Sequence, residues 1–142
     1  MPRKAKTKGP SVFISHCSVN LEDAKQIETA LTDRGFEVWL DDSNIRVGVL
    51  LGKELLQAIA ASRAVALIWS AAAKDSAWVT TEILAAFHLN RFILPYTLDT
   101  TEFPQFLSQS IHRDLTKDRG GVLAKLPQDV KRAPRSLTNF RV

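Results

Sequence analysis

The residues of this chain best suited to chemistry lie in the stretch SAWVTTEIL, residues 76–84, where Trp78 and Glu82 are four positions apart. Four residues make about one helical turn, so on a helix both side chains project to the same side. At about 100° per residue, Val79 and Ile83 define the buried face, and Glu82 falls at its margin. A carboxylate at that margin is partly removed from water, and a neighbouring indole removes it further. Two interpretations fit: a reactive carboxylate in a site, or a rim glutamate paired with a basic neighbour.

A second group of polar residues closes two short apolar runs. Ser15, His16 and Cys17 end or follow the run VFIS, and Asp41 follows FEVWL. Neighbouring residues on a strand point to opposite faces, so His16 and Cys17 are not expected to form a dyad. The three histidines and the single cysteine have no metal-ligand spacing, which argues against a metal site. The chain also lacks the G-x-S-x-G sequence of a hydrolase nucleophile elbow.

The common phosphate-binding motifs are absent as well. Neither G-x-x-x-x-G-K-[ST] nor G-x-G-x-x-G occurs, and GVLLG has the wrong spacing, so a dinucleotide held in the Rossmann manner is not expected. A phosphorelay receiver would need an acidic cluster after its first strand. Here the first predicted strand ends in SHCS, and the Asp pair follows the second.

Strand-like and helix-like segments alternate along the chain. The predicted strands cover 12–16, 36–40, 64–69, 91–98 and, more weakly, 112–117. The predicted helices begin after Asn20, near Leu51, at Asp75 or Ser76, at 104 (a short segment to 111) and at 121 (to 132). Asn20 with Asp23 resembles a weak capping box, and Gly35 lies where a helix C-terminus is expected. Pro95 indicates an edge strand or a bulge.

This alternation predicts an α/β domain built from right-handed βαβ units. We expect a flavodoxin-like three-layer fold, with a mostly parallel sheet of about five strands in the order 2-1-3-4-5 and helices on both faces. In such sheets ligands bind at the C-terminal strand ends, near the switch point between strands one and three. Glu82 lies one to two turns into the helix that leaves strand three, and is therefore expected beside Ser15–Cys17 and Asp41.

Composition and charge limit the function classes. The chain has 142 residues, is 45% hydrophobic and carries a net charge of +4. Residues 1–10 and 131–142 each hold four basic groups and no acid, so the body between them is net negative. We therefore expect a domain over 11–130 between a flexible basic tail at 1–10 and a basic tail at 131–142. Such tails can contact nucleic acid or anionic lipid, but short charged ends are usually solvated.

The cellular context follows from what the sequence lacks. No apolar run approaches the roughly 18 residues that span a membrane, and no apolar segment of a secretory signal follows the basic N-terminus. A single cysteine forms no internal disulfide. We expect a cytoplasmic protein with no membrane association and no specific nucleic-acid partner.

Taken in order, these segments resemble the Toll/interleukin-1 receptor (TIR) domain family over residues 11–130. VFISHCS is similar to the family's first strand, and FEVWLDDSNIRVG to its second strand and BB loop, with Gly48 at the usual glycine. ELLQAIAAS and AVALIWS follow in the family's order. WVTTEI, residues 78–83, matches the W-x-x-x-E stretch of TIR domains that consume NAD.

The resemblance implies an NAD⁺ hydrolase or cyclase that cleaves the nicotinamide–ribose bond and releases nicotinamide with ADP-ribose or a cyclic variant. It makes Glu82 the catalytic residue and places Trp78, Ser15–Cys17, Asp41 and Gly48 at the substrate. NAD is then a substrate, and no cofactor is needed.

The resemblance also bears on partners. It implies a role in immune or antiphage signalling, with homo-oligomers formed through the loop 43–52 and neighbouring helices, or a partner protein in trans. The alternative that it leaves open is a non-catalytic TIR module that acts through protein–protein contacts.

Overall fold

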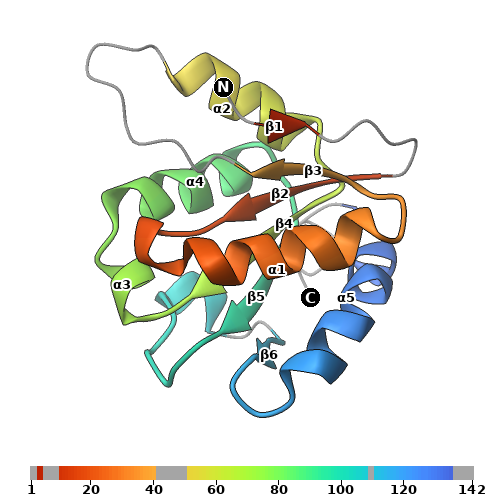
Figure 1. Ribbon diagram of the computed structural model, residues 1–142. Coiled ribbons are helices and arrows are strands. Elements are labelled where there is room, and N and C mark those ends of the chain that lie inside the picture. Colours follow the sequence, from red (N-terminus) through yellow and green to blue (C-terminus); the bar gives the residue numbers. More distant parts are fainter. Residues whose placement is uncertain (1–2, 5–9, 41–50, 109–110, 136–142) are drawn as a thin grey trace.

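One sheet forms the centre of the molecule. The computed structural model describes residues 3–4, 10–40, 51–108 and 111–135. Within these residues six strands lie in the order β1-β3-β2-β4-β5-β6 (Figure 1). They are β1 (Arg3–Lys4), β2 (Ser11–Ser15), β3 (Glu37–Leu40), β4 (Ala64–Trp69), β5 (Ile93–Thr97) and β6 (Arg113–Asp114). The five strands from β2 to β6 are parallel. Numbered from β2, their order is the predicted 2-1-3-4-5.

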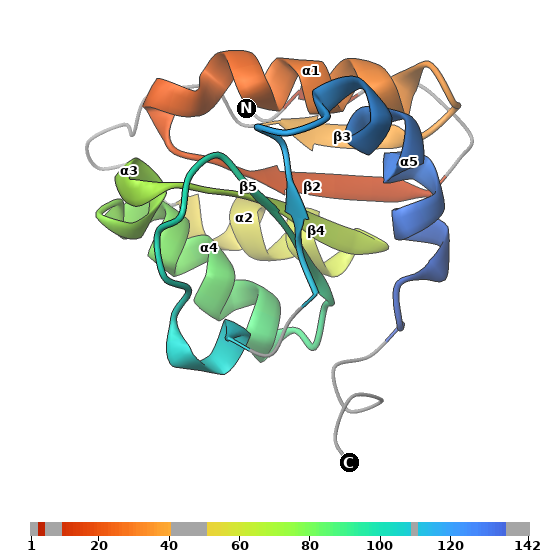
Figure 2. The same cartoon turned by 90° about the horizontal axis from the view of Figure 1, so that it is seen from below.

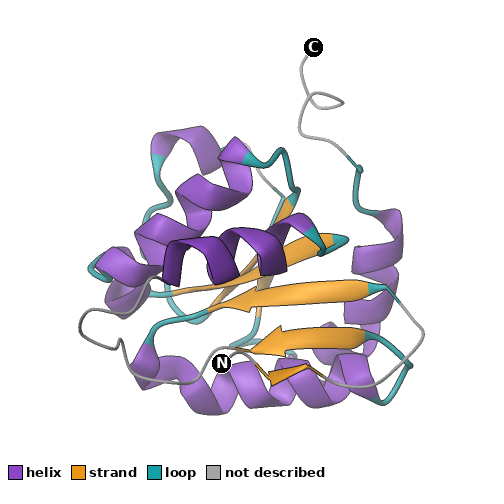
Figure 3. Ribbon diagram, turned by 90° about the horizontal axis from the view of Figure 1, so that it is seen from above, coloured by secondary structure: helices purple, strands orange, loops and turns teal. Residues whose placement is uncertain are grey.

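Helices cover both faces of the sheet, as the alternation predicts. They are α1 (Leu21–Thr32), α2 (Leu51–Ala60), α3 (Ala71–Lys74), α4 (Ala77–His88) and α5 (Arg119–Arg132), with short 3-10 helices η1 (Ser18–Asn20) and η2 (Gln105–Leu107). Figure 2 shows α1 and α5 on one side of the strands and α2 and α4 on the other, and Figure 3 shows the sheet between them. The described part of the chain is therefore the expected three-layer domain.

The core is divided between these two faces by the alternation of the strands. Val12 and Ile14 of β2 pack with α1 and α5, whereas Phe13 packs with α2 and α4. All six residues of β4 are buried, because this strand lies between β2 and β5 and is covered on both sides. A central parallel strand needs apolar residues at every position for this reason.

Several predicted helix ends are confirmed. The Ser76 side chain accepts a hydrogen bond from the Val79 N–H and so caps α4. Gly35 follows α1 with a φ of 86°, a conformation that glycine adopts without steric cost. The predicted capping box at α1 is wrong: Asn20 is the N-cap residue, but its side chain makes no cap hydrogen bond, and Asp23 pairs with Arg119 at 2.6 Å.

Two details of the sheet differ from the prediction. Pro95 is neither on an edge strand nor at a bulge, because β5 lies between β4 and β6 in regular parallel register. The missing N–H is tolerated because β6 pairs only with Tyr96 and Thr97. Also, β1 adds an antiparallel edge to β3. Of the helix predicted at 104–111, the residues Gln105–Leu107 form a 3-10 helix, and residues 109–110 lie outside the described part of the chain.

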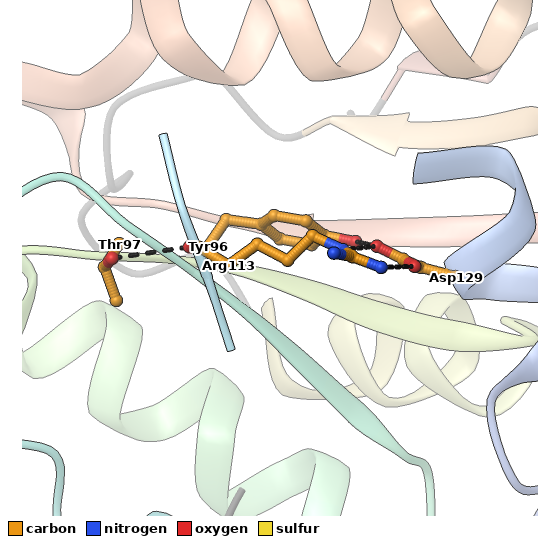
Figure 4. Close-up of polar contacts among 4 residues, drawn as sticks. All are labelled: Tyr96, Thr97, Arg113 and Asp129. Atoms are coloured by element: carbon orange, nitrogen blue, oxygen red, sulfur yellow. Dashed lines mark hydrogen bonds and ion pairs between the residues drawn. The ribbon is translucent and has the colours of Figure 1, made fainter. Parts of the chain in front are cut away.

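A polar network fixes α5 to the far edge of the sheet (Figure 4). The Arg113 guanidinium of β6 donates two hydrogen bonds to the Asp129 carboxylate, at 2.6 and 2.8 Å. Tyr96 of β5 donates its phenolic O–H to the same carboxylate at 3.0 Å. Burial, with the charge of Asp129 and the hydrogen bond to it, raises the pKa of Tyr96 far above its usual range.

Candidate active site

The carboxylate singled out by its spacing meets the end of the central strand β2. Glu82 lies in the second turn of α4, and α4 packs against β2. Ser15, the last residue of β2, donates its hydroxyl to Glu82 Oε1 at 2.6 Å. Ser15 is 0% exposed and Glu82 is 2% exposed. The fold thus joins two residues 67 positions apart, both predicted to lie at this edge of the sheet.

Glu82 is buried more deeply than its spacing predicts. Helical periodicity places it at the margin of the apolar face, yet its side chain is almost fully removed from solvent. The reason is tertiary: α4 is covered on this side by the end of β2, so its margin is enclosed. The alternative of a rim glutamate paired with a basic neighbour is therefore wrong in its location, because Glu82 is buried and not at the rim. A buried carboxylate needs compensating hydrogen bonds, and Ser15 supplies one.

The remaining predicted site residues divide into two groups. His16 and Cys17 are both buried at the end of β2, at 6% and 7% exposure. Trp78 is half-buried and packs against the core cluster between the sheet and the α2–α4 layer. Asp41 and Gly48 lie outside the described residues.

The structure adds two residues that the sequence analysis did not propose. Asn20 Oδ1 accepts a hydrogen bond from Cys17 Sγ at 2.9 Å and another from Ser70 Oγ at 2.9 Å. Ser70 directly follows β4 and also accepts from the Ala73 N–H at 3.1 Å, which caps α3. The available signals were an Asn at a helix start and a Ser after a buried strand. Both have ordinary local explanations as caps, and these concealed the contact between them.

The end of β5 completes this edge of the sheet. Asp99 accepts hydrogen bonds from the backbone N–H groups of Ala71 and Thr101, at 2.9 and 3.0 Å. Hydrogen bonding by Thr101 and Ala71 lowers the pKa of the Asp99 carboxyl. Trp69 donates its indole N–H to the Thr101 carbonyl at 3.1 Å and stacks on Phe103. The loop after β5 is thereby tied to the end of β4.

The chemistry of this arrangement is that of one buried carboxylate oriented by a hydroxyl. The Ser15 hydroxyl contacts Oε1 and so fixes the orientation of the Glu82 carboxyl group. Among the described residues, no three His, Cys, Asp or Glu side chains are grouped so that they could hold a metal ion. In that same part of the chain, no helix is long and apolar enough to cross a bilayer.

Fold and site together define a class: a doubly wound α/β domain whose candidate site lies at the C-terminal strand edge, where β2 and β4 meet. The family model for the TIR domain matches residues 12–126, and the chain belongs to the TIR domain family. The recognition made from VFISHCS, FEVWLDDSNIRVG and WVTTEI is therefore confirmed.

Three known proteins are similar to this chain in sequence or in structure. It is 31% identical over 94 residues to the probable 2′ cyclic ADP-D-ribose synthase TcpO of Methanobrevibacter olleyae; the match covers 63% of this chain and 28% of that protein. The TIR domain of the Toll-related receptor TRR-2 from Hydra magnipapillata is similar in structure, with a TM-score of 0.71 and 17% identity over 84% of this chain and 97% of that one. The CMP N-glycosidase BcmB of Clostridium botulinum has a TM-score of 0.60 and 18% identity over 83% of this chain and 98% of that one. The two structures show the shared fold.

Proposed function

We propose that this TIR domain cleaves the bond between nicotinamide and ribose in NAD⁺. The observation that carries the proposal is the Glu82 carboxylate, buried and held by Ser15 at the strand edge where α/β domains bind ligands. The relationship to a protein named as a probable cyclic ADP-D-ribose synthase supports the substrate class. A scaffold shared with a protein named as a CMP N-glycosidase is compatible with the same type of bond being broken.

The reaction needs little from the protein beyond one negative charge. When the C1′–N1 bond breaks, its electron pair leaves with the nicotinamide nitrogen, so neutral nicotinamide departs without a general acid. Positive charge then develops on C1′ and the ring oxygen of the ribose, as in glycoside cleavage. The Glu82 carboxylate stabilises that charge, most strongly in a site without water. Attack by water gives ADP-ribose, and attack by a group of the same nucleotide gives a cyclic product.

The other site residues take supporting roles in this proposal. Ser15 fixes the orientation of Oε1, so the carboxylate does not have to reorganise as charge develops. Trp78, one turn before Glu82 and half-buried, presents an aromatic surface for the nicotinamide or the adjoining ribose. His16 and Cys17 line the same edge, and Asp41 and Gly48 stay expectations from the family resemblance.

The burial of Glu82 sets a condition on catalysis. A side chain that is 2% exposed does not contact a substrate until neighbouring atoms move. Activity therefore depends on a rearrangement of this edge, and self-association is one event that supplies it. For this reason the assay must include protein concentrations and crowding agents that favour assembly.

The test is incubation of the purified chain with NAD⁺, with nicotinamide and nucleotide products separated by chromatography. Glu82→Gln keeps the shape of the side chain and removes its charge. We expect a loss of at least about 100-fold in nicotinamide release, in line with the cost of removing one electrostatic stabiliser from an active site. Thr81→Val, on the exposed side of the same helix, is the matched control and should retain activity.

Two results would count against the proposal. Equal nicotinamide release by wild type and Glu82→Gln would exclude Glu82 as the catalytic residue. Absence of turnover by the wild type under every condition, including those that drive assembly, would favour the alternative of a non-catalytic interaction module. A role in immune or antiphage signalling is part of the proposal, and the product found in the assay decides which kind of signal the chain can make.

A further inference from the structure

The Asn20 side chain connects the two segments that form the candidate site. Its Oδ1 accepts from Cys17, two residues after Ser15, and from Ser70, directly after β4. These strands are neighbours in the sheet, and the strand order reverses at the boundary between them. One amide oxygen therefore ties the ends of β2 and β4 at the switch point.

This use of Asn20 replaces a local interaction that its position favours. Asn is a preferred N-cap residue because its oxygen can accept from the N–H groups of the first helical turn. Asn20 is the N-cap residue of α1, but its side chain makes no such bond. The oxygen is directed instead at Ser70, 50 residues away in the chain.

The connection continues from Ser70 to the helix that carries Glu82. Ser70 Oγ accepts from the Ala73 N–H at 3.1 Å and so fixes the start of α3. α3 in turn packs against α4. The end of β2 is thus joined to the β4–α4 segment twice: by the 2.6 Å contact of Ser15 with Glu82, and by the contacts of Asn20.

On the basis of the proposed function, we infer that Asn20 is a positioning residue for Glu82, acting through Ser70 and Cys17. It fixes the separation between the end of β2 and the α3–α4 segment and thereby holds Ser15 against the carboxylate. It does not have to touch the substrate. A catalytic group displaced by about 1 Å loses on the order of 100-fold in rate, so a second link at this junction has a measurable effect.

The first test is kinetic. We expect Asn20→Ala and Ser70→Ala each to lower kcat about tenfold while KM changes less than about twofold, the pattern of an interaction lost in the transition state. The loss of kcat in the double variant should be smaller than the product of the two single losses, because both changes remove the Asn20–Ser70 hydrogen bond. Asn20→Asp keeps an oxygen that accepts from both partners and should restore most of kcat.

The control is Ser62→Ala. Ser62 is also buried and donates to the Ala58 carbonyl at 2.8 Å, but it precedes β4 and lies at the opposite edge of the sheet. Its loss should affect stability and leave kcat unchanged. Three results would each overturn the inference. They are an unchanged kcat in Asn20→Ala, a kcat in Asn20→Asp no higher than in Asn20→Ala, and a loss of kcat in Ser62→Ala equal to that in Asn20→Ala.

The second test does not depend on turnover. Protein labelled with ¹³C at the glutamate carboxyl carbons gives an NMR signal for Glu82, identified by its absence in Glu82→Gln. That signal should move in Asn20→Ala and in Ser70→Ala and stay in place in Ser62→Ala. An unmoved signal in Asn20→Ala overturns the positioning role. If the signal moves but wild type releases no nicotinamide, the proposed reaction fails and the positioning of Glu82 stands.

Discussion

The hydrogen bond between Ser15 and Glu82 is the interaction at the candidate site whose strength can be measured most directly. A hydrogen bond to a charged group contributes about 1.5–3 kcal/mol to stability, roughly twice a neutral one. The 2.6 Å separation lies in the short range typical of a hydroxyl on a carboxylate. Both side chains are excluded from solvent, so water does not weaken the interaction. We therefore expect a coupling energy of about 2 kcal/mol between them.

A double-mutant cycle measures this energy. Unfolding free energies from urea titrations of wild type, Ser15→Ala, Glu82→Ala and the double variant give the coupling, and cavity effects of the single changes largely cancel. A parallel cycle pairs Ser62→Ala with Glu82→Ala. Ser62 hydrogen-bonds the Ala58 carbonyl and precedes β4, whereas Glu82 lies beside the end of β2, so the coupling of Ser62 to Glu82 should lie within about 0.5 kcal/mol of zero.

The cycle has a clear negative outcome. A Ser15–Glu82 coupling below about 0.5 kcal/mol would mean that the hydroxyl does not hold an ionised carboxylate. The orienting role of Ser15 in the proposed reaction would then have to be abandoned, whatever the activity of Glu82→Gln.

Two further predictions concern pH. Because the pKa of Tyr96 is raised in the folded protein, the tyrosine ionises first in the unfolded chain, above about pH 10. The free energy of unfolding is therefore intact below that pH and falls as pH rises. In Tyr96→Phe this decrease at alkaline pH should be absent. Because Tyr96 is the chain's single tyrosine, its tyrosinate absorbance should appear only together with unfolding, and absorbance from folded protein would contradict the prediction. Because the pKa of Asp99 is lowered in the folded protein, its carboxylate stabilises the folded state at pH values above its unfolded pKa of about 3.9. This contribution to the free energy of unfolding is lost as pH falls through the folded pKa. Urea midpoints should therefore be lower for Asp99→Asn than for wild type at neutral pH and converge in acid, and a constant gap would show that ionisation of Asp99 is not the cause.

The architecture could be predicted because its signals are local and repeated. Apolar runs such as AVALIW, separated by helical periodicities, require a parallel sheet with crossovers, and right-handed crossovers leave few strand orders. The structure has that order. The same reasoning failed at Pro95. Whether a strand tolerates a residue without an N–H depends on the length of the neighbouring strand, here β6, and the residues around the proline do not predict that length.

The candidate site could be predicted in its location but not in its contacts. Placing Glu82 after the third parallel strand was sufficient to bring it to the edge that carries Ser15. Its depth was underestimated, because helical periodicity describes one helix and not what lies against it. Asn20 was assigned to a helix cap on its local preference, whereas its oxygen bonds Ser70.

The sequence by itself therefore determined the order of the layers, the family and the position of the candidate carboxylate, because each follows from residue types and their spacing along the chain. Only the tertiary structure decided that Glu82 is buried, that Ser15 is its hydrogen-bond donor and that Asn20 joins β2 to β4. The physical reason is the range of the interactions. Helix and strand preferences act over a few neighbouring residues, whereas burial and hydrogen-bond partners depend on segments 50 or more positions apart that meet only when the sheet closes.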